Sequence, residues 1–168
     1  MPSTNRRARG AGLAGELQRA LAQEELFLEY QPIFRIDTGH IEGVEALVRW
    51  MHPERGRLPP GAFIPVANET GLIKELGYYV LRKGLADFAR LRQRNGSRHS
   101  FWLSVNVSPV QLLSDDFACH VGTVLREMGA SGDELVLEVT EDVLTPSISK
   151  VGEKGEQLPI IGLSRRTC

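Results

Sequence analysis

The stretch Glu42-Gly43-Val44-Glu45-Ala46-Leu47-Val48-Arg49-Trp50 reads as a β-strand with charged residues among apolar ones. A turn at Asp37-Thr38-Gly39 precedes it, and its valines and tryptophan favour extended backbone. Because side chains alternate along a strand, Glu45, Leu47 and Arg49 point to one face. Charged residues are rarely buried without a partner. The pattern is therefore compatible with a solvated face, with an intra-strand ion pair or with a functional site.

The composition is typical of one globular domain. The chain has 168 residues, of which 42% are hydrophobic and 24% are charged, enough for a sizeable core. A net charge of −1 creates no field that attracts a nucleic acid polymer or an anionic membrane. Cys119 and Cys168 form neither a metal-ligand spacing nor a disulfide framework, which favours the cytoplasm. No apolar run reaches the roughly 20 residues of a membrane span.

Apolar spacing along the chain predicts helices that alternate with strands. Residues 1–12 lack the apolar stretch of a signal peptide and are expected to be a disordered lead. A helix is expected from Leu13 to about residue 24, followed by a strand at 26–31 that Pro32 stops and that pairs as an antiparallel hairpin with residues 42–50. The later elements are a loop at 51–56, helices at 61–68 and 72–91, a strand at 101–108, a helix N-capped by Ser114 and closed by Gly129, and a strand at 135–141.

Strands that alternate with helices predict βα units, a parallel sheet and an α/β fold. A rolled-up sheet of this kind places its chemistry at the carboxyl ends of its strands. Glu45, Asn106 and Glu138 are polar residues in mid or late strand, on three different strands. Two carboxylates and an amide oxygen suit the divalent cation of a phosphodiester hydrolase. Each also has a structural interpretation, because such an asparagine often caps a turn and a strand glutamate often faces water.

Several motifs occur in the order found in one enzyme family. Glu45-Ala46-Leu47-Val48-Arg49-Trp50 resembles the name-giving motif of the EAL family, bacterial phosphodiesterases that hydrolyse cyclic di-GMP in signal transduction. The other similar segments are Tyr30-Gln31-Pro32-Ile33, residues 63–73, Ser104-Val105-Asn106-Val107-Ser108 and Leu137-Glu138-Val139-Thr140-Glu141. The resemblance extends from about Leu13 to Leu144.

The resemblance implies a fold and a set of roles. The fold is a partial TIM-type (β/α) barrel of the EAL type, comprising the N-terminal half only, with its first strand antiparallel. Glu45, Asn106 and Glu138 are implied to be ligands of Mg²⁺ or Mn²⁺, and Glu45 is implied to be catalytic. Gln31 and Arg49 are implied to contact cyclic di-GMP, the arginine fork being suited to phosphate. The reaction implied is metal-dependent hydrolysis to linear pGpG.

The chain also departs from the family pattern. Glu141 is implied to orient an active-site loop. The family's later Asp-Asp segment, lysine and second glutamate cannot be placed in this sequence. The Asp-Asp pair that does occur, Asp115-Asp116, lies at the expected start of a helix. From Pro146 onward no helical or strand period is sustained. We therefore expect a partial EAL domain at 13–145 and a non-homologous, poorly ordered tail at 146–168, as a frameshift or premature stop would produce.

An incomplete site predicts an impaired phosphodiesterase with little or no activity. Two other interpretations stay open: a non-catalytic module that binds cyclic di-GMP or a protein, and a non-functional gene remnant. Half a barrel would expose parallel strand edges, which predicts self-association or a homodimer.

Overall fold

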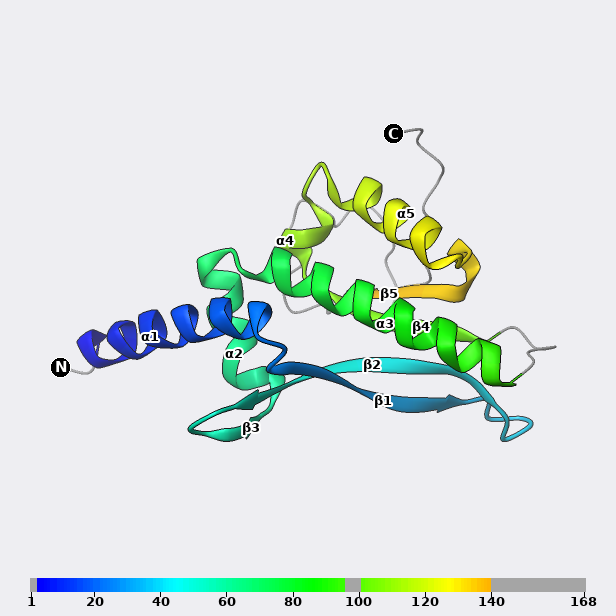
Figure 1. The fold of residues 1–168 in the computed structure, drawn as a ribbon, viewed down its shortest axis with the longest axis horizontal. Coiled ribbons are helices and arrows are strands. Elements are labelled where there is room, and N and C mark those ends of the chain that lie inside the picture. The colour runs from blue at the N-terminus through cyan, green and yellow to red at the C-terminus, as the bar shows by residue number, and fades with distance from the viewer. Residues whose placement is uncertain (1–2, 96–100, 140–168) are drawn as a thin grey trace, which may run out of the picture.

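The computed structural model describes residues 3–95 and 101–139, which form a mixed β-sheet packed against helices (Figure 1). The helices are α1 (Ser3–Ala22), α2 (Pro60–Thr70), α3 (Ile73–Asn95), α4 (Pro109–Leu112) and α5 (Phe117–Met128), with a short 3-10 helix, η1, at Gly132–Glu134. The strands are β1 (Leu26–Phe34), β2 (Ile41–His52), β3 (Gly56–Leu58), β4 (Trp102–Val107) and β5 (Leu135–Val139). The α/β class predicted from the sequence is confirmed.

The sheet combines a hairpin with parallel strands. Its strand order is β1-β2-β4-β5, and β3 pairs with β2 as well. β1 is antiparallel to β2, whereas β2 with β4 and β4 with β5 are parallel, as predicted. Pro32 does not stop β1, because the strand continues to Phe34 with Pro32 opposite Val44. β1 lies at an edge of the described sheet, and an edge strand tolerates a residue that lacks the backbone N–H.

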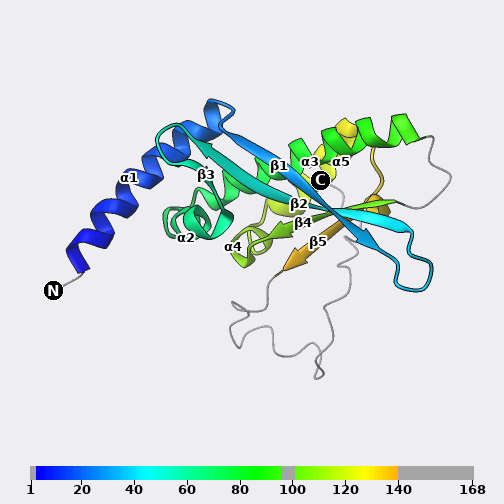
Figure 2. The ribbon, with the colours of Figure 1, turned by 90° about the horizontal axis from the view of Figure 1, so that it is seen from below.

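Helix α3 covers one face of the sheet. Figures 1 and 2 show α3 running along the strands, with α5 on the same side of β4 and β5. Gly84 of α3 faces the sheet so closely that a Cβ there would lie 3.2 Å from Leu103 and 3.9 Å from the Cβ of Ala46. The residues buried at this interface alternate with polar ones along the strands. The opposite face of the sheet is therefore the polar one.

The starts of α1 and α5 differ from the predicted ones, and one short helix was not predicted. α1 begins at Ser3, so residues 3–12, expected to be a disordered lead, are helical. The N-cap of α5 is Asp116 rather than Ser114. The short helix α4, which was not predicted, starts after Ser108, whose hydroxyl accepts a hydrogen bond from the backbone N–H of Gln111 while Gln111 Oε1 accepts from the N–H of Ser108. Within the described residues, no helix is long and apolar enough to cross a membrane.

The carboxyl end of β2 is anchored in the core. Trp50 is fully buried, packs edge-on against Phe63 and donates its indole N–H to Glu25 at 3.0 Å. His52 is also buried, and its Nε2 lies 3.2 Å from Glu16 of α1. The loop predicted at 51–56 is in fact the end of β2, a tight turn and the start of β3. These contacts tie α1 and α2 to the strand that carries Glu45.

Gly77→Ala is expected to lower the free energy of unfolding by about 1–3 kcal/mol, the usual effect of overpacking a filled site. An added Cβ would lie 1.5 Å from Gln111 Nε2, and Gln111 is 3% exposed and held by its capping box. Urea unfolding followed by circular dichroism measures the change. Gly61→Ala is the matched control, because nothing lies within 4 Å of its added Cβ. Equal stability of the two variants would contradict the expected clash.

Candidate active site

The polar face of the sheet is built by alternate residues of four strands. Gln31 of β1 is opposite Glu45 of β2, and Glu45 is opposite Ser104 of β4. Asn106 is then opposite Glu138 of β5. The parallel pairing of β2, β4 and β5 thus brings the three predicted metal ligands onto neighbouring strands of one face.

Two hydrogen bonds cross between these strands. Asn106 Nδ2 donates to Glu45 Oε1 at 2.7 Å, and the Ser104 hydroxyl donates to Glu138 Oε1. Asn106 and Glu138 are exposed and Glu45 is half-buried, whereas Ser104 is fully buried. Two carboxylates are therefore presented to solvent, each held by a neutral hydrogen-bond donor on β4.

Arg49 does not pair with Glu45 on its own strand. Its Nε donates to Glu29 Oε2 at 2.8 Å and its Nη1 to the carbonyl of Val48 at 2.9 Å. Arg57 of β3 donates to the same oxygen of Glu29 at 2.5 Å. Two guanidinium groups therefore converge on one carboxylate beside Gln31, on the same face of the sheet as Glu45.

Gln31 is the other residue predicted to contact the substrate. Gln31 is exposed on the edge strand next to Glu45, in a position from which its amide can reach a ligand. Glu141 lies outside the described residues. Sequence reasoning did not assign roles to Ser104 or Glu29, although each lies two residues before a predicted site residue on the same strand face. That two-residue spacing was the available signal.

The donor set fits a hard divalent cation. Glu45, Glu138 and Asn106 offer carboxylate and amide oxygens, and a cation such as Mg²⁺ or Mn²⁺ is commonly held by a few such ligands together with water and phosphate oxygens. Within residues 3–95 and 101–139, no group of three or more His, Cys, Asp and Glu side chains could hold a metal ion. The candidate set is compatible with this finding, because only two of its three members are carboxylates and the third is an amide, which such a group does not include.

The amino-terminal end of the polar face is closed by an aromatic ring. Trp102 of β4 is opposite Gly43 of β2, and a Cβ on Gly43 would lie 2.6 Å from the indole ring. The ring therefore lies directly over the glycine. The apolar indole ring therefore lies next to Glu45 and Ser104, toward the amino-terminal ends of β2 and β4.

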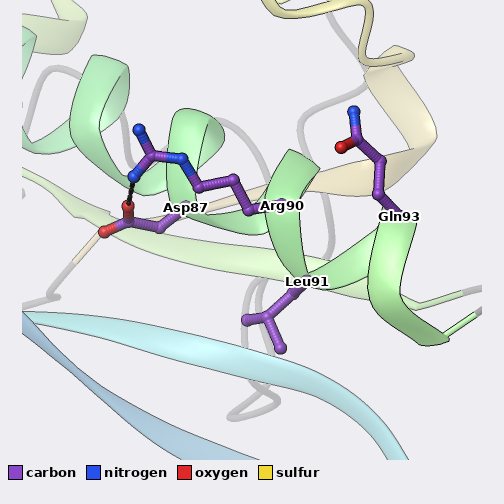
Figure 3. Close-up of a pocket in the computed structure, with 4 residues that line it drawn as sticks. All are labelled: Asp87, Arg90, Leu91 and Gln93. Carbon is purple, nitrogen blue, oxygen red and sulfur yellow. Dashed lines mark hydrogen bonds and ion pairs between the residues drawn. The ribbon is translucent and has the colours of Figure 1, made fainter.

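A hollow on α3 is unrelated to this site. It is lined by Asp87, Arg90, Leu91 and Gln93, and Figure 3 shows Asp87 and Arg90 pointing toward each other, 3.0 Å apart. Asp87 also accepts a hydrogen bond from the Tyr30 hydroxyl at 2.9 Å. Burial, together with this hydrogen bond, raises the pKa of Tyr30 well above its ordinary value, so the phenol stays a donor. Tyr30 faces α3, so the hollow lies across the sheet from Glu45.

Comparison with known proteins identifies the family. The model of the EAL domain matches residues 14–161, so residues 146–161, expected to be unrelated sequence, fall within the matched range. An uncharacterised signalling protein of Caulobacter vibrioides is 40% identical over 90% of this chain and 18% of its own length. The probable cyclic di-GMP phosphodiesterase PdeI of Escherichia coli is 39% identical over 79% of this chain and 17% of its own length.

A solved structure supports the same relationship. The PaMucR phosphodiesterase in complex with c-di-GMP aligns with a TM-score of 0.72 and 35% identity, covering 77% of this chain and 52% of that chain. The chain thus spans less than a fifth of the length of these two curated relatives and about half of this structure. With most of its residues matched by the family model, the chain belongs to the EAL domain family.

Proposed function

We propose that the polar face is part of the active site of a metal-dependent cyclic di-GMP phosphodiesterase, which hydrolyses one phosphodiester bond to give linear pGpG. The observation that carries this proposal is the meeting of Glu45, Asn106 and Glu138 on three adjacent strands. Membership of the EAL family supports it, as do relatives named for this activity or solved with this ligand.

The proposed roles follow from the chemistry of each group. Glu45, Asn106 and Glu138 would hold Mg²⁺ or Mn²⁺, which supplies Lewis acidity and a water of lowered pKa. Asn106 would then ligate through Oδ1, since its Nδ2 is a donor that bonds to Glu45. Arg49 would contact a phosphate through its planar fork, and Gln31 would hydrogen-bond to the nucleotide.

We extend the proposal to the fold and to Glu141. Strands β1, β2, β4 and β5 would be part of a TIM-type barrel whose interior is the polar face, as supported by the parallel strands and by the one-sided cover of α3. Glu141, outside the described residues, would orient an active-site loop. A cytoplasmic location and self-association through strand edges stay predictions.

Residues 1–168 by themselves are proposed to hydrolyse cyclic di-GMP slowly. Among the described residues only two carboxylates, those of Glu45 and Glu138, are proposed as ligands, for a reaction in which cations must stabilise both the attacking and the leaving oxygen. The same shortage favours a second candidate function, a module that binds cyclic di-GMP without hydrolysis. Incubation with MnCl₂ and cyclic di-GMP, with pGpG quantified by liquid chromatography, tests the rate. Turnover equal to that of a longer EAL protein would contradict the slow rate, and calorimetric binding without pGpG would favour the binding module.

Arg49→Ala is expected to weaken cyclic di-GMP binding roughly 10- to 100-fold, the usual effect of losing a charge-assisted hydrogen bond. Isothermal titration calorimetry in the presence of CaCl₂ measures the dissociation constant, once liquid chromatography has verified that no pGpG forms under these conditions. Arg90→Ala is the matched control, because Arg90 is also ion-paired but lies across the sheet.

Glu29→Gln separates the contact of Arg49 with phosphate from its ion pair with Glu29. This variant removes the charge that pairs with Arg49 and keeps the arginine itself. If Arg49 contacts the phosphate directly, Glu29→Gln is expected to bind cyclic di-GMP at least as tightly as Arg49→Ala. If the ion pair with Glu29 also orients the guanidinium, Glu29→Gln is expected to bind more weakly than Arg90→Ala. Equal binding by Arg49→Ala and wild type would contradict the substrate role.

A further inference from the structure

Ser104 carries a fully buried hydroxyl on the polar face, and the proposed function gives it no role. Its side chain is fully buried between β2 and β5, directly opposite Glu45 in the β2–β4 register. Its hydroxyl donates to Glu138 Oε1, and Glu138 lies two residue pairs further along the β4–β5 register than Val136, the partner of Ser104. A buried hydroxyl needs a hydrogen-bond partner, and the carboxylate of Glu138 provides it.

This bond restrains an otherwise exposed side chain. Glu138 lies on β5, at the edge of the described sheet, and its side chain is exposed. A glutamate in this position has several staggered rotamers available, and ordering it has an entropic cost. A charge-assisted hydrogen bond from a fixed donor selects the rotamer that lies over β4, toward Glu45. The carboxylate is then ordered before any ligand arrives.

The hydrogen bonds of Asn106 and Ser104 leave different atoms available to a cation. The bond from Asn106 Nδ2 to Glu45 leaves Oδ1 as the ligand atom of that amide, because an amide N–H₂ cannot ligate a cation. The bond from Ser104 occupies only Oε1 of Glu138, so Oε2 can bind a cation while the hydroxyl stays in place. Ser104 can therefore hold the Glu138 carboxylate both before and after a cation binds.

We propose that Ser104 is a positioning residue that holds the Glu138 carboxylate for a divalent cation shared with Glu45. The inference rests on the proposed function, since it assumes a cation at these ligands. Partners that orient a ligand typically change metal affinity 10- to 100-fold. Loss of the hydroxyl leaves Glu138 free to turn toward solvent, and the cation must then order it.

Calorimetric titration of MnCl₂ into metal-free protein, residues 1–168, tests the proposal without relying on turnover. Ser104→Ala is expected to weaken Mn²⁺ binding about 10- to 100-fold. Ser104→Thr keeps the hydroxyl and is expected to bind within a few-fold of wild type. Thr123→Ala is the control for loss of a hydroxyl hydrogen bond elsewhere, because Thr123 donates to the carbonyl of Cys119 within α5. It is expected to bind Mn²⁺ as wild type does.

A second variant keeps the test decisive if Ser104→Ala does not fold. Ser104→Cys is close to isosteric, and a thiol is a weak donor, so its Mn²⁺ affinity is expected to fall below that of Ser104→Thr. Wild-type affinity in Ser104→Ala or Ser104→Cys would overturn the positioning role and leave the proposed function intact. Failure of the wild-type chain to bind Mn²⁺ at millimolar concentration would overturn both.

Discussion

Glu45→Ala is expected to abolish Mn²⁺-dependent hydrolysis of cyclic di-GMP by this chain, with a loss of at least about 100-fold, because removing a ligand exceeds the effect of removing its supporting partner. Glu45 stands between Gln31 and Ser104 in the sheet and accepts the hydrogen bond of Asn106. Its loss removes one of the two carboxylates proposed as metal ligands and frees the Asn106 side chain. Production of pGpG over time at saturating MnCl₂ measures the change.

Glu42→Ala provides a control on the same strand. Glu42 lies at the irregularity in the β1–β2 register and is ion-paired with Arg35 at 2.9 Å near the hairpin turn. This variant removes the same charge from the same strand, so its hydrolysis rate is expected to equal that of wild type. If both variants lose activity alike, net charge or strand stability explains the result, and the ligand role of Glu45 is wrong.

Trp50→Ala is expected to lower the free energy of unfolding by about 3–5 kcal/mol, the range seen when large buried aromatic residues are truncated. Trp50 has no exposed surface, packs against Phe63 and His52, and donates to Glu25. Small domains are stable by only about 5–15 kcal/mol, so the variant is expected to lose a large fraction of its free energy of unfolding. Urea denaturation followed by far-ultraviolet circular dichroism measures the shift.

Met51→Ala is the neighbouring control. Met51 is 51% exposed, and truncation of an exposed side chain usually changes stability by less than about 0.5 kcal/mol. A Trp50→Ala variant as stable as Met51→Ala would show that the end of β2 is not part of the cooperative core. The contacts beyond it, such as those of His52 and Arg55 with Glu16, would then carry little of the stability.

Alternation along a strand was enough to place the polar face from sequence. Glu45 and Arg49 were predicted to share a face, and the structure puts them there with Gln31 and Asn106. The partner of Arg49 was not predictable, because it depends on the register of β1 against β2. That register follows from the length of the connecting turn and an irregularity between Ile33 and Phe34, which periodicity does not encode.

Short elements and uncapped boundaries were missed for a different reason. A four-residue helix such as α4 has too little length to show a period, although Ser108-Pro109 followed by Gln111 is a capping sequence with proline at the first turn. Apolar spacing in α1 begins only at Leu13, so periodicity could not detect its earlier residues. β3 has three residues and, in the described part of the chain, pairs with β2 alone; its composition is typical of a loop and did not indicate a strand.

The pairing of β2 with β4 has a consequence for how the site forms. Sixty-one positions separate Glu45 from Asn106, and α2 and α3 lie between them in the sequence. Contacts so distant in sequence require closure of a long loop and slow the folding of the sheet that contains them. The hairpin of β1 and β2 can form locally, placing Gln31 beside Glu45 early. Binding of a cation by the three strands would then report on completed folding of the sheet rather than on any single strand.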